Sequence, residues 1–306
     1  DYGIIGAAYA TFLVILIMNS LKLYLVKLKF KIHPYSFDTM KIIILTGNET
    51  RHKFFRKTIS ADKRISVISS YCEGAEKSLE NRVKESVNSS ALEIQHVNAR
   101  AQAEKDFFDS YIKNLTDMSC PKFLSKGQIN DDIIVNDIIK KNPDLIICYG
   151  SSLIKSVLLE KFKGRFLNVH LGLSPYYRGS GTNIWPLING EPGMVGATYM
   201  YIDSGIDTGH IIHQIRAEIF LGDSPHSIGN RLIKKMTFTY ADIIANFEEL
   251  VDEEQPKDKG KLYLKKDFNS EACYRLYQNF NNGIVEKHLN SEKKYSYIVE
   301  NSGLKL

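Results

Sequence analysis

Three polar side chains have residue types and spacing suited to chemistry. Asn168 and His170 stand two positions apart at the end of an apolar run, and Asp207 follows in a turn flanked by glycines. If residues 165–169 form a strand, its period of two places Asn168 and His170 on one face at the carboxyl end, where open α/β sheets bind ligands. Because histidine exchanges protons near neutral pH, this edge is a candidate site for proton transfer.

The same residues also allow a structural interpretation. A histidine at a strand end is commonly a satisfied surface or core residue, and the run Ser-Gly-Ile-Asp-Thr-Gly at 204–209 has the composition that turns favour. The local pattern alone therefore leaves both catalysis and structure open.

A family resemblance adds to this pattern. The motifs that carry it are Asn168-Val169-His170, Leu173-Ser174-Pro175, Arg178-Gly179 and Asp207-Thr208-Gly209, in that order. Together they resemble the signature of the folate-dependent formyltransferases, which include methionyl-tRNA formyltransferase, glycinamide ribonucleotide transformylase and the sugar-amine N-formyltransferases. The resemblance covers about residues 41–250. It implies an enzyme of one-carbon metabolism with a Rossmann-like three-layer α/β fold and a mostly parallel sheet.

The resemblance implies a reaction in which an amine attacks the formyl carbon of 10-formyltetrahydrofolate. The tetrahedral intermediate carries negative charge on oxygen and an extra proton on nitrogen. By resemblance, Asn168 donates a hydrogen bond to the oxyanion, and His170 moves the proton or stabilises the oxyanion when charged. Asp207 would keep His170 charged or orient a water that relays the proton. No metal is implied.

The same resemblance implies residues that bind the formyl donor, and two glycine-containing turns indicate residues that bind the acceptor. The formyl donor is expected to contact the segment after residues 144–148 and the loop before Asp207, at Ser151, Leu153, Ile202, Gly205 and Ile206. The candidates for acceptor binding are Asn48, Arg51, Arg178 and Thr182. A helix cap at residues 47–50 and a structural loop at 173–185 are the alternatives for these residues.

Hydrophobic patterns predict the elements that position the site. Apolar runs predict strands at 41–46, 65–70, 144–148 and 165–169. Two further strands, at 195–202 and 210–215, are predicted on either side of the Asp207 turn. Helices are predicted after residues 47–50, across 79–115 with breaks, at 131–141 before an Asn-Pro stop, and at 223–250 after an Asp-Ser-Pro start. We expect Trp185 to pack beneath the 173–185 loop.

Residues 1–39 do not match the rest of the chain. Residues 2–21 are uncharged and apolar and match in length the ~20 residues that a membrane-spanning helix needs, and lysines follow at 22, 27, 29 and 31. The segments at 2–10 and 29–34 resemble the last helix and tail of a polysaccharide flippase. Because Met40 stands directly before a strong strand, we expect the enzyme to begin there and residues 1–39 to come from a joined reading frame. A genuine anchor facing the cytoplasm is the alternative.

The predicted organisation is therefore a leader at 1–39, a catalytic domain at 40–250 and a short C-terminal extension at 251–306. The extension is polar and tyrosine-rich, and it lacks the alternating strands of the small β-barrel that methionyl-tRNA formyltransferases carry. This pattern argues against tRNA as the acceptor.

Composition narrows the function classes further. The formal net charge of +5 is spread along the chain, so no nucleic-acid groove is indicated. The four cysteines show no metal-ligand spacing and fit reduced thiols in a cytoplasmic enzyme. The partners expected are folate and a small amine, foremost a nucleotide-linked amino sugar of polysaccharide biosynthesis. The sequence does not fix the oligomeric state and is compatible with a homodimer.

Alternatives remain open for the function. Glycinamide ribonucleotide and methionyl-tRNA are the next acceptors. A formyltetrahydrofolate hydrolase would use the same three side chains, and a non-catalytic, membrane-tethered binding module is the alternative from a different class.

Overall fold

The computed structural model describes residues 3, 9, 12–22, 39–76, 78–256, 260–292 and 296–304. The chain divides into two compact units, Asp1–Thr39 and Met40–Leu306. In the first unit, residues 12–22 are helical. Positions 2, 4–8, 10 and 11 of the predicted apolar span, and the lysines at 27, 29 and 31, lie outside the described residues. Within the described part, no helix is long and apolar enough to cross a membrane.

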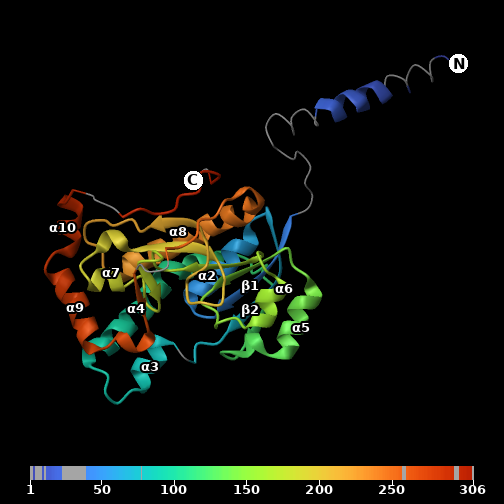
Figure 1. Cartoon of the computed structure of the whole chain (residues 1–306). Helices are drawn as coiled ribbons and strands as arrows, with labels where there is room; N and C mark the ends of the chain where they lie inside the picture. Colours follow the sequence, from blue (N-terminus) through green and yellow to red (C-terminus); the bar gives the residue numbers. More distant parts are fainter. Residues whose placement is uncertain are drawn as a thin grey trace. The chain divides into compact units, whose positions relative to one another are not determined.

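A seven-stranded sheet forms the centre of the second unit (Figure 1). Its spatial order is β3-β2-β1-β4-β5-β7-β8. The first five strands in this order are parallel, whereas β7 runs antiparallel to both β5 and β8. The strands are β1 (Met40–Gly47), β2 (Ile65–Glu73), β3 (Pro121–Leu124), β4 (Leu145–Tyr149), β5 (Phe166–His170), β7 (Gly196–Tyr201) and β8 (Ile211–Arg216). The predicted mostly parallel sheet is confirmed.

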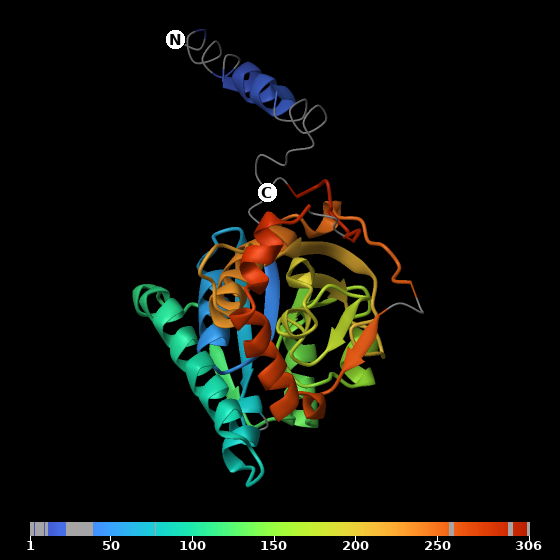
Figure 2. The same ribbon diagram turned by 90° about the vertical axis from the view of Figure 1, so that its left-hand side faces the viewer.

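Helices cover both faces of this sheet because its central strands are apolar on both sides. Ile42 and Ile44 of β1 pack in the same cluster as Phe54 of α2 (Thr50–Ala61), together with residues of α4 (Ala91–Asn114) and α8 (Pro225–Ala245). Ile43 and Leu45 face a second cluster formed with α5 (Asp132–Lys141) and α6 (Ser156–Lys161). The three-layer α/β fold is therefore confirmed (Figures 1 and 2).

Local sequence signals explain where the helices begin and end. The predicted 79–115 segment is two helices, α3 (Leu79–Glu85) and α4, with Ser78 and Ser90 as their N-caps. Helix α5 ends at Lys141, where Asn142 adopts a left-handed conformation with φ 41°. Helix α8 begins with Ser224 as its N-cap and Pro225 in the first turn, as the Asp-Ser-Pro pattern predicts.

The C-terminal residues pack on the same compact unit as the sheet. Strand β9 (Lys261–Tyr263) pairs in parallel with β6 (Tyr177–Gly179) in a second, two-stranded sheet. Helix α9 (Ser270–Asn281) contacts both α4 and the short helix α7 (Trp185–Ile188), and α10 (Ile284–Asn290) follows it (Figure 2). The extension therefore supports the loop that contains β6.

Trp185 occupies the interior of this loop. Its ring stacks on Tyr263 with 4.4 Å between ring centroids, and Tyr177 stacks on the same tyrosine at 5.7 Å. The predicted packing of Trp185 beneath the loop is confirmed, since only 7% of the residue is exposed.

Candidate active site

Strand β5 places Asn168 and His170 at the carboxyl edge of the sheet. Asn168 lies between Cys148 of β4 and Met200 of β7, and His170 pairs with Thr198 of β7. Because side chains alternate along a strand, Asn168 and His170 share one face, while Val169 between them is buried in the core on the other face. The predicted common face of the two polar residues is therefore present.

The His170 ring is held at both nitrogens. Nδ1 lies 3.2 Å from Asp207 Oδ2. Nε2 lies 2.9 Å from the Tyr177 carbonyl oxygen and 3.1 Å from Thr182 Oγ1. Because a carbonyl oxygen only accepts, Nε2 donates its hydrogen to Tyr177. The structure thus brings His170 and Asp207 together, as predicted, and fixes the plane of a ring that is 7% exposed.

The turn that carries Asp207 is itself fixed. Asp207 has φ 53°, and its Oδ2 accepts a 2.8 Å hydrogen bond from the Gly179 N–H. The Gln255 side-chain amide donates to the carbonyl oxygens of Asp207 at 3.2 Å and of Gly209 at 2.6 Å. A Cβ at position 209 would come within 1.9 Å of the Tyr201 carbonyl oxygen, so only glycine allows the turn to approach β7 this closely.

Asn168 differs from His170 in its side-chain contacts. The residue is half-buried, and its side-chain amide makes no hydrogen bond to any residue that the structure describes. An amide on the same strand face as His170, with its N–H groups uncommitted, is suited to donate to a developing oxyanion.

The residues predicted to contact the formyl donor lie on segments that follow β4 and β7, the two neighbours of β5. Leu153 is 71% exposed and Ile206 is 39% exposed. Ile202 packs against the same apolar cluster as Ile154, the residue after Leu153. Ser151 follows the turn at Gly150 after β4, and the Gly205 N–H donates to Asp203 Oδ1 at 2.9 Å. Each of the two segments therefore exposes an apolar side chain, Leu153 after β4 and Ile206 after β7.

The four predicted acceptor-binding residues differ in how far their side chains are already bonded within the protein. The Arg51 guanidinium lies 2.9 Å from Glu104 and also pairs with Glu49. Although burial opposes its charge, these two carboxylates raise the pKa of Arg51 above its ordinary value. Thr182 is 2% exposed and bonds His170. Its hydroxyl is therefore committed to the histidine.

Asn48 and Arg178 are less committed. The Asn48 Oδ1 atom and the Arg178 Nε atom are both buried without a hydrogen-bond partner in the described part of the chain. Neither residue forms an ion pair or hydrogen bond through its side chain with any described residue. These two remain the candidates with polar groups still to be satisfied.

Two contributors to the site could not be found from sequence reasoning. The Tyr177 carbonyl oxygen acts through the backbone, so its residue type gives no signal. Gln255 lies in a charged, proline-containing stretch that resembles a surface loop, yet it is 7% exposed and binds the Asp207 turn. Both contacts depend on how distant segments pack.

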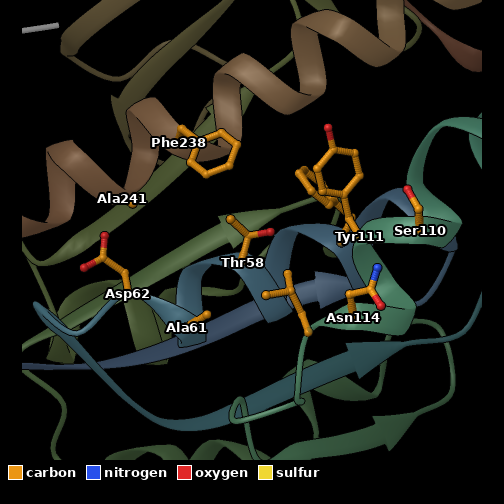
Figure 3. Close-up of a pocket in the computed structure, with 10 residues that line it drawn as sticks. Thr58, Ala61, Asp62, Ser110, Tyr111, Asn114, Phe238 and Ala241 are labelled. Carbon is orange, nitrogen blue, oxygen red and sulfur yellow. The ribbon is translucent and has the colours of Figure 1, made fainter.

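A cleft of about 620 Å³ lies away from these residues, between α2, α4 and α8 (Figure 3). Thr58 and Ala61 of α2, Tyr111 of α4 and Phe238 of α8 line it (Figure 3). Because α2 and α4 lead back to the amino ends of β2 and β3, the cleft lies toward the edge of the sheet opposite His170.

Comparisons with known proteins point to one family. The chain is 38% identical to a methionyl-tRNA formyltransferase of Alkaliphilus oremlandii (strain OhILAs) over 107 residues, which are 34% of each protein. It is 32% identical to the methionyl-tRNA formyltransferase of Geobacter metallireducens over 155 residues, which are 50% of this chain and 46% of that protein. The matches thus span between about a third and half of these curated relatives.

A solved structure of a sugar N-formyltransferase from Shewanella sp. FDAARGOS_354 superimposes with a TM-score of 0.51. It covers 79% of this chain and 88% of that chain at 15% identity, a likeness that shows the fold. Residues 40–244 match the profile of the formyl transferase family. This match includes β1 to β8 and the residues around His170, and the chain belongs to the formyl transferase family.

Proposed function

We propose that this chain is a 10-formyltetrahydrofolate-dependent N-formyltransferase that moves a formyl group to the primary amine of a small molecule. The observation that carries the proposal is the position of His170 between Asp207 and Tyr177. His170 shares a strand face with Asn168, whose side chain bonds no residue that the structure describes. The membership of the family and the order of the three residues support it.

The residues present fit the formyl donor. Leu153 and Ile206, on the segments that follow β4 and β7, expose apolar side chains of the kind that contact a planar pterin ring. Asn48 Oδ1, buried without a partner in the described part of the chain, can accept a hydrogen bond from an N–H or O–H group of the second substrate, the amine. When bound, the donor supplies the formyl carbon that the amine attacks.

The residues of the chain then have separate roles. As the C–N bond to the acceptor forms, the amide of Asn168 donates to the oxygen that gains negative charge. His170 accepts the surplus proton of the acceptor nitrogen, directly or through water, and returns a proton to the nitrogen that leaves when its C–N bond to the formyl carbon breaks. Asp207 holds the ring at Nδ1 and stabilises its charged form.

A nucleotide-linked amino sugar is the acceptor that we propose first. The resemblance of residues 1–39 to a polysaccharide flippase favours this acceptor, because it suggests a gene neighbourhood of surface-polysaccharide synthesis. The described part of the extension consists of β9, α9, α10 and a short turn of helix, and it packs on the catalytic fold. This packing favours a small acceptor over a large one.

The test is mass-spectrometric detection of product by the full chain, supplied with 10-formyltetrahydrofolate and a panel of acceptors. The panel contains amino-sugar nucleotides, glycinamide ribonucleotide and methionyl-tRNA. We expect a mass gain of one formyl group on an amino-sugar nucleotide. Formylation of one of the other two would replace the proposed acceptor, and formate release without any acceptor would favour a hydrolase.

A further inference from the structure

A buried carboxylate, that of Glu73, contacts residues 150–155, the segment after β4 that we expect to bind the formyl donor. Glu73 is the last residue of β2 and is 0% exposed. Burying a charge is costly unless hydrogen bonds and opposite charge compensate for it. The reaction described above does not use Glu73, so its burial requires another explanation.

The compensation comes from two neighbouring loops. Glu73 Oε1 accepts a hydrogen bond of 2.7 Å from the Gly127 N–H. Oε2 accepts one of 2.6 Å from the Ser152 N–H and lies 3.2 Å from Lys126 Nζ. Burial raises the pKa of Glu73, but Lys126 and these N–H donors outweigh burial and hold the pKa below its ordinary value. The side chain is therefore a carboxylate that ties β2 to the segment after β4.

A second side chain holds the same segment. The Asn130 side chain donates to the Leu153 carbonyl oxygen at 2.9 Å and accepts from the Lys155 N–H at 2.8 Å. Residues 151–155 form no helix or strand, so side-chain contacts such as these define their path. The backbone of the segment is held from beneath, while the Leu153 side chain stays 71% exposed.

We infer that Glu73 is a positioning residue for the formyl donor, which acts through the Ser152 N–H to hold residues 150–155 in the shape that binds the pterin ring. The inference rests on the proposed function and deepens it. Glu73 would then contribute to the affinity for the donor, whereas Asn168 and His170 would carry out the chemical step.

The experiment compares the full-length wild type with Glu73→Gln in tetrahydrofolate binding by calorimetry and in the kinetics of donor consumption. In this variant an NH₂ group replaces one of the two carboxylate oxygens, so one of the hydrogen bonds from the Gly127 and Ser152 N–H groups is lost. We expect the Kd for tetrahydrofolate and the KM for the donor to rise about tenfold to a hundredfold, the range that loss of hydrogen bonds to a charged group gives. The kcat at saturating donor should change by much less.

Two further variants separate positioning from general destabilisation. Asp117→Asn removes a carboxylate that binds Arg56 and Ser119 before the amino end of β3, and it should bind tetrahydrofolate as the wild type does. Asn130→Ala loosens the same segment without touching the buried charge, and it should raise the KM for the donor even if Glu73→Gln does not fold.

The outcomes are distinguishable. If the wild type binds tetrahydrofolate and both Glu73→Gln and Asn130→Ala bind it equally well, the inference is wrong and the proposed function stands. A fall in kcat with an unchanged KM would also overturn the inference. If the wild type binds no tetrahydrofolate, the proposed function fails and takes the inference with it.

Discussion

His170 differs from the other buried histidines in what its ring faces. His52 and His213 each accept a hydrogen bond at Nδ1 from a backbone N–H, and burial lowers the pKa of both. His52 also has a carboxylate near Nδ1, since Glu49 Oε2 lies 3.6 Å away, whereas His170 has a carboxylate at Nδ1 and a carbonyl oxygen at Nε2. Acceptors on both sides suit a ring that carries a second proton during the reaction, and these contacts support the proposal that His170 is the proton carrier.

Asp207→Asn tests the partner of that proton carrier. The substitution removes the negative charge at Nδ1 and should lower kcat for formyl transfer by about a hundredfold or more, the contribution typical of acid–base catalysis. Steady-state kinetics across a range of pH measure the effect. Asp252→Asn is the matched control, because Asp252 pairs with the outward His210 at 2.5 Å. Equal losses in the two variants would contradict the assigned role of Asp207.

Asn168→Ala should separate activity from stability. An oxyanion donor contributes about 3 kcal/mol to the transition state, so we expect kcat to fall by about a hundredfold to a thousandfold. Since the Asn168 amide bonds no described residue, the midpoint of thermal unfolding should scarcely change. A strongly destabilised variant, or one with normal kcat, would show that Asn168 has a structural role instead.

At the scale of elements, sequence patterns located the main strands and helices well. The run Ile42 to Leu45 has no polar residue, so it predicts a strand buried on both faces, and β1 has that burial. The three-residue strands β6 and β9 were not predicted, because they are too short to show a period and pair across about eighty residues of sequence.

The same limit applied to the site. Asn168, His170 and Asp207 could be proposed from motifs. Whether a side chain is free to bind a ligand, however, depends on hydrogen bonds and ion pairs with residues far away in the sequence. The Arg51 guanidinium donates a hydrogen bond to Glu104 of α4, and the Gln255 side chain donates one to the carbonyl oxygen of Asp207. Such long-range contacts leave no local pattern. The roles assigned to the individual site residues remain predictions.

Gly179→Ala tests the junction between β6 and the Asp207 turn. Gly179 has φ 95°, and a Cβ there would meet the Tyr263 carbonyl oxygen at 2.2 Å. We expect a loss of about 1–3 kcal/mol in the free energy of unfolding and reduced formyl transfer, because the Gly179 N–H would no longer reach Asp207.

Gly190→Ala is the control for Gly179→Ala. Gly190 also has a positive φ of 81°, but a Cβ there meets no atom within 4 Å. Both variants carry the backbone strain, and only Gly179→Ala adds the collision. Urea denaturation of the two should therefore differ, and equal unfolding free energies would show that the close approach of β6 and β9 contributes little.

At the scale of the whole molecule, buried neutral histidines set a pH dependence of stability. Burial lowers the pKa of His213 and of His226 to about 4. In the unfolded chain both titrate near pH 6.5, so the unfolded state binds protons more readily below that pH. Stability should fall as pH drops from about 6.5 to about 4, by up to about 1.4 kcal/mol per pH unit for each proton.

Urea denaturation at a series of pH values measures that slope. His213→Asn should flatten it, because the Asn oxygen can accept the Asn301 N–H that now bonds His213 Nδ1 without binding a proton. If the pH dependence of the unfolding free energy is the same in His213→Asn as in the wild type, other groups cause the acid sensitivity.

The most direct measurement of the central claim is formyl transfer by the wild type, His170→Ala and His210→Ala under identical conditions. Both histidines pair with an aspartate, but only His170 is buried beside Asn168 on β5. We predict transfer by the wild type and by His210→Ala, and a loss of about a hundredfold to ten-thousandfold in kcat for His170→Ala. Transfer by His170→Ala at the wild-type rate would contradict the assignment of the active site to the carboxyl edge of β5.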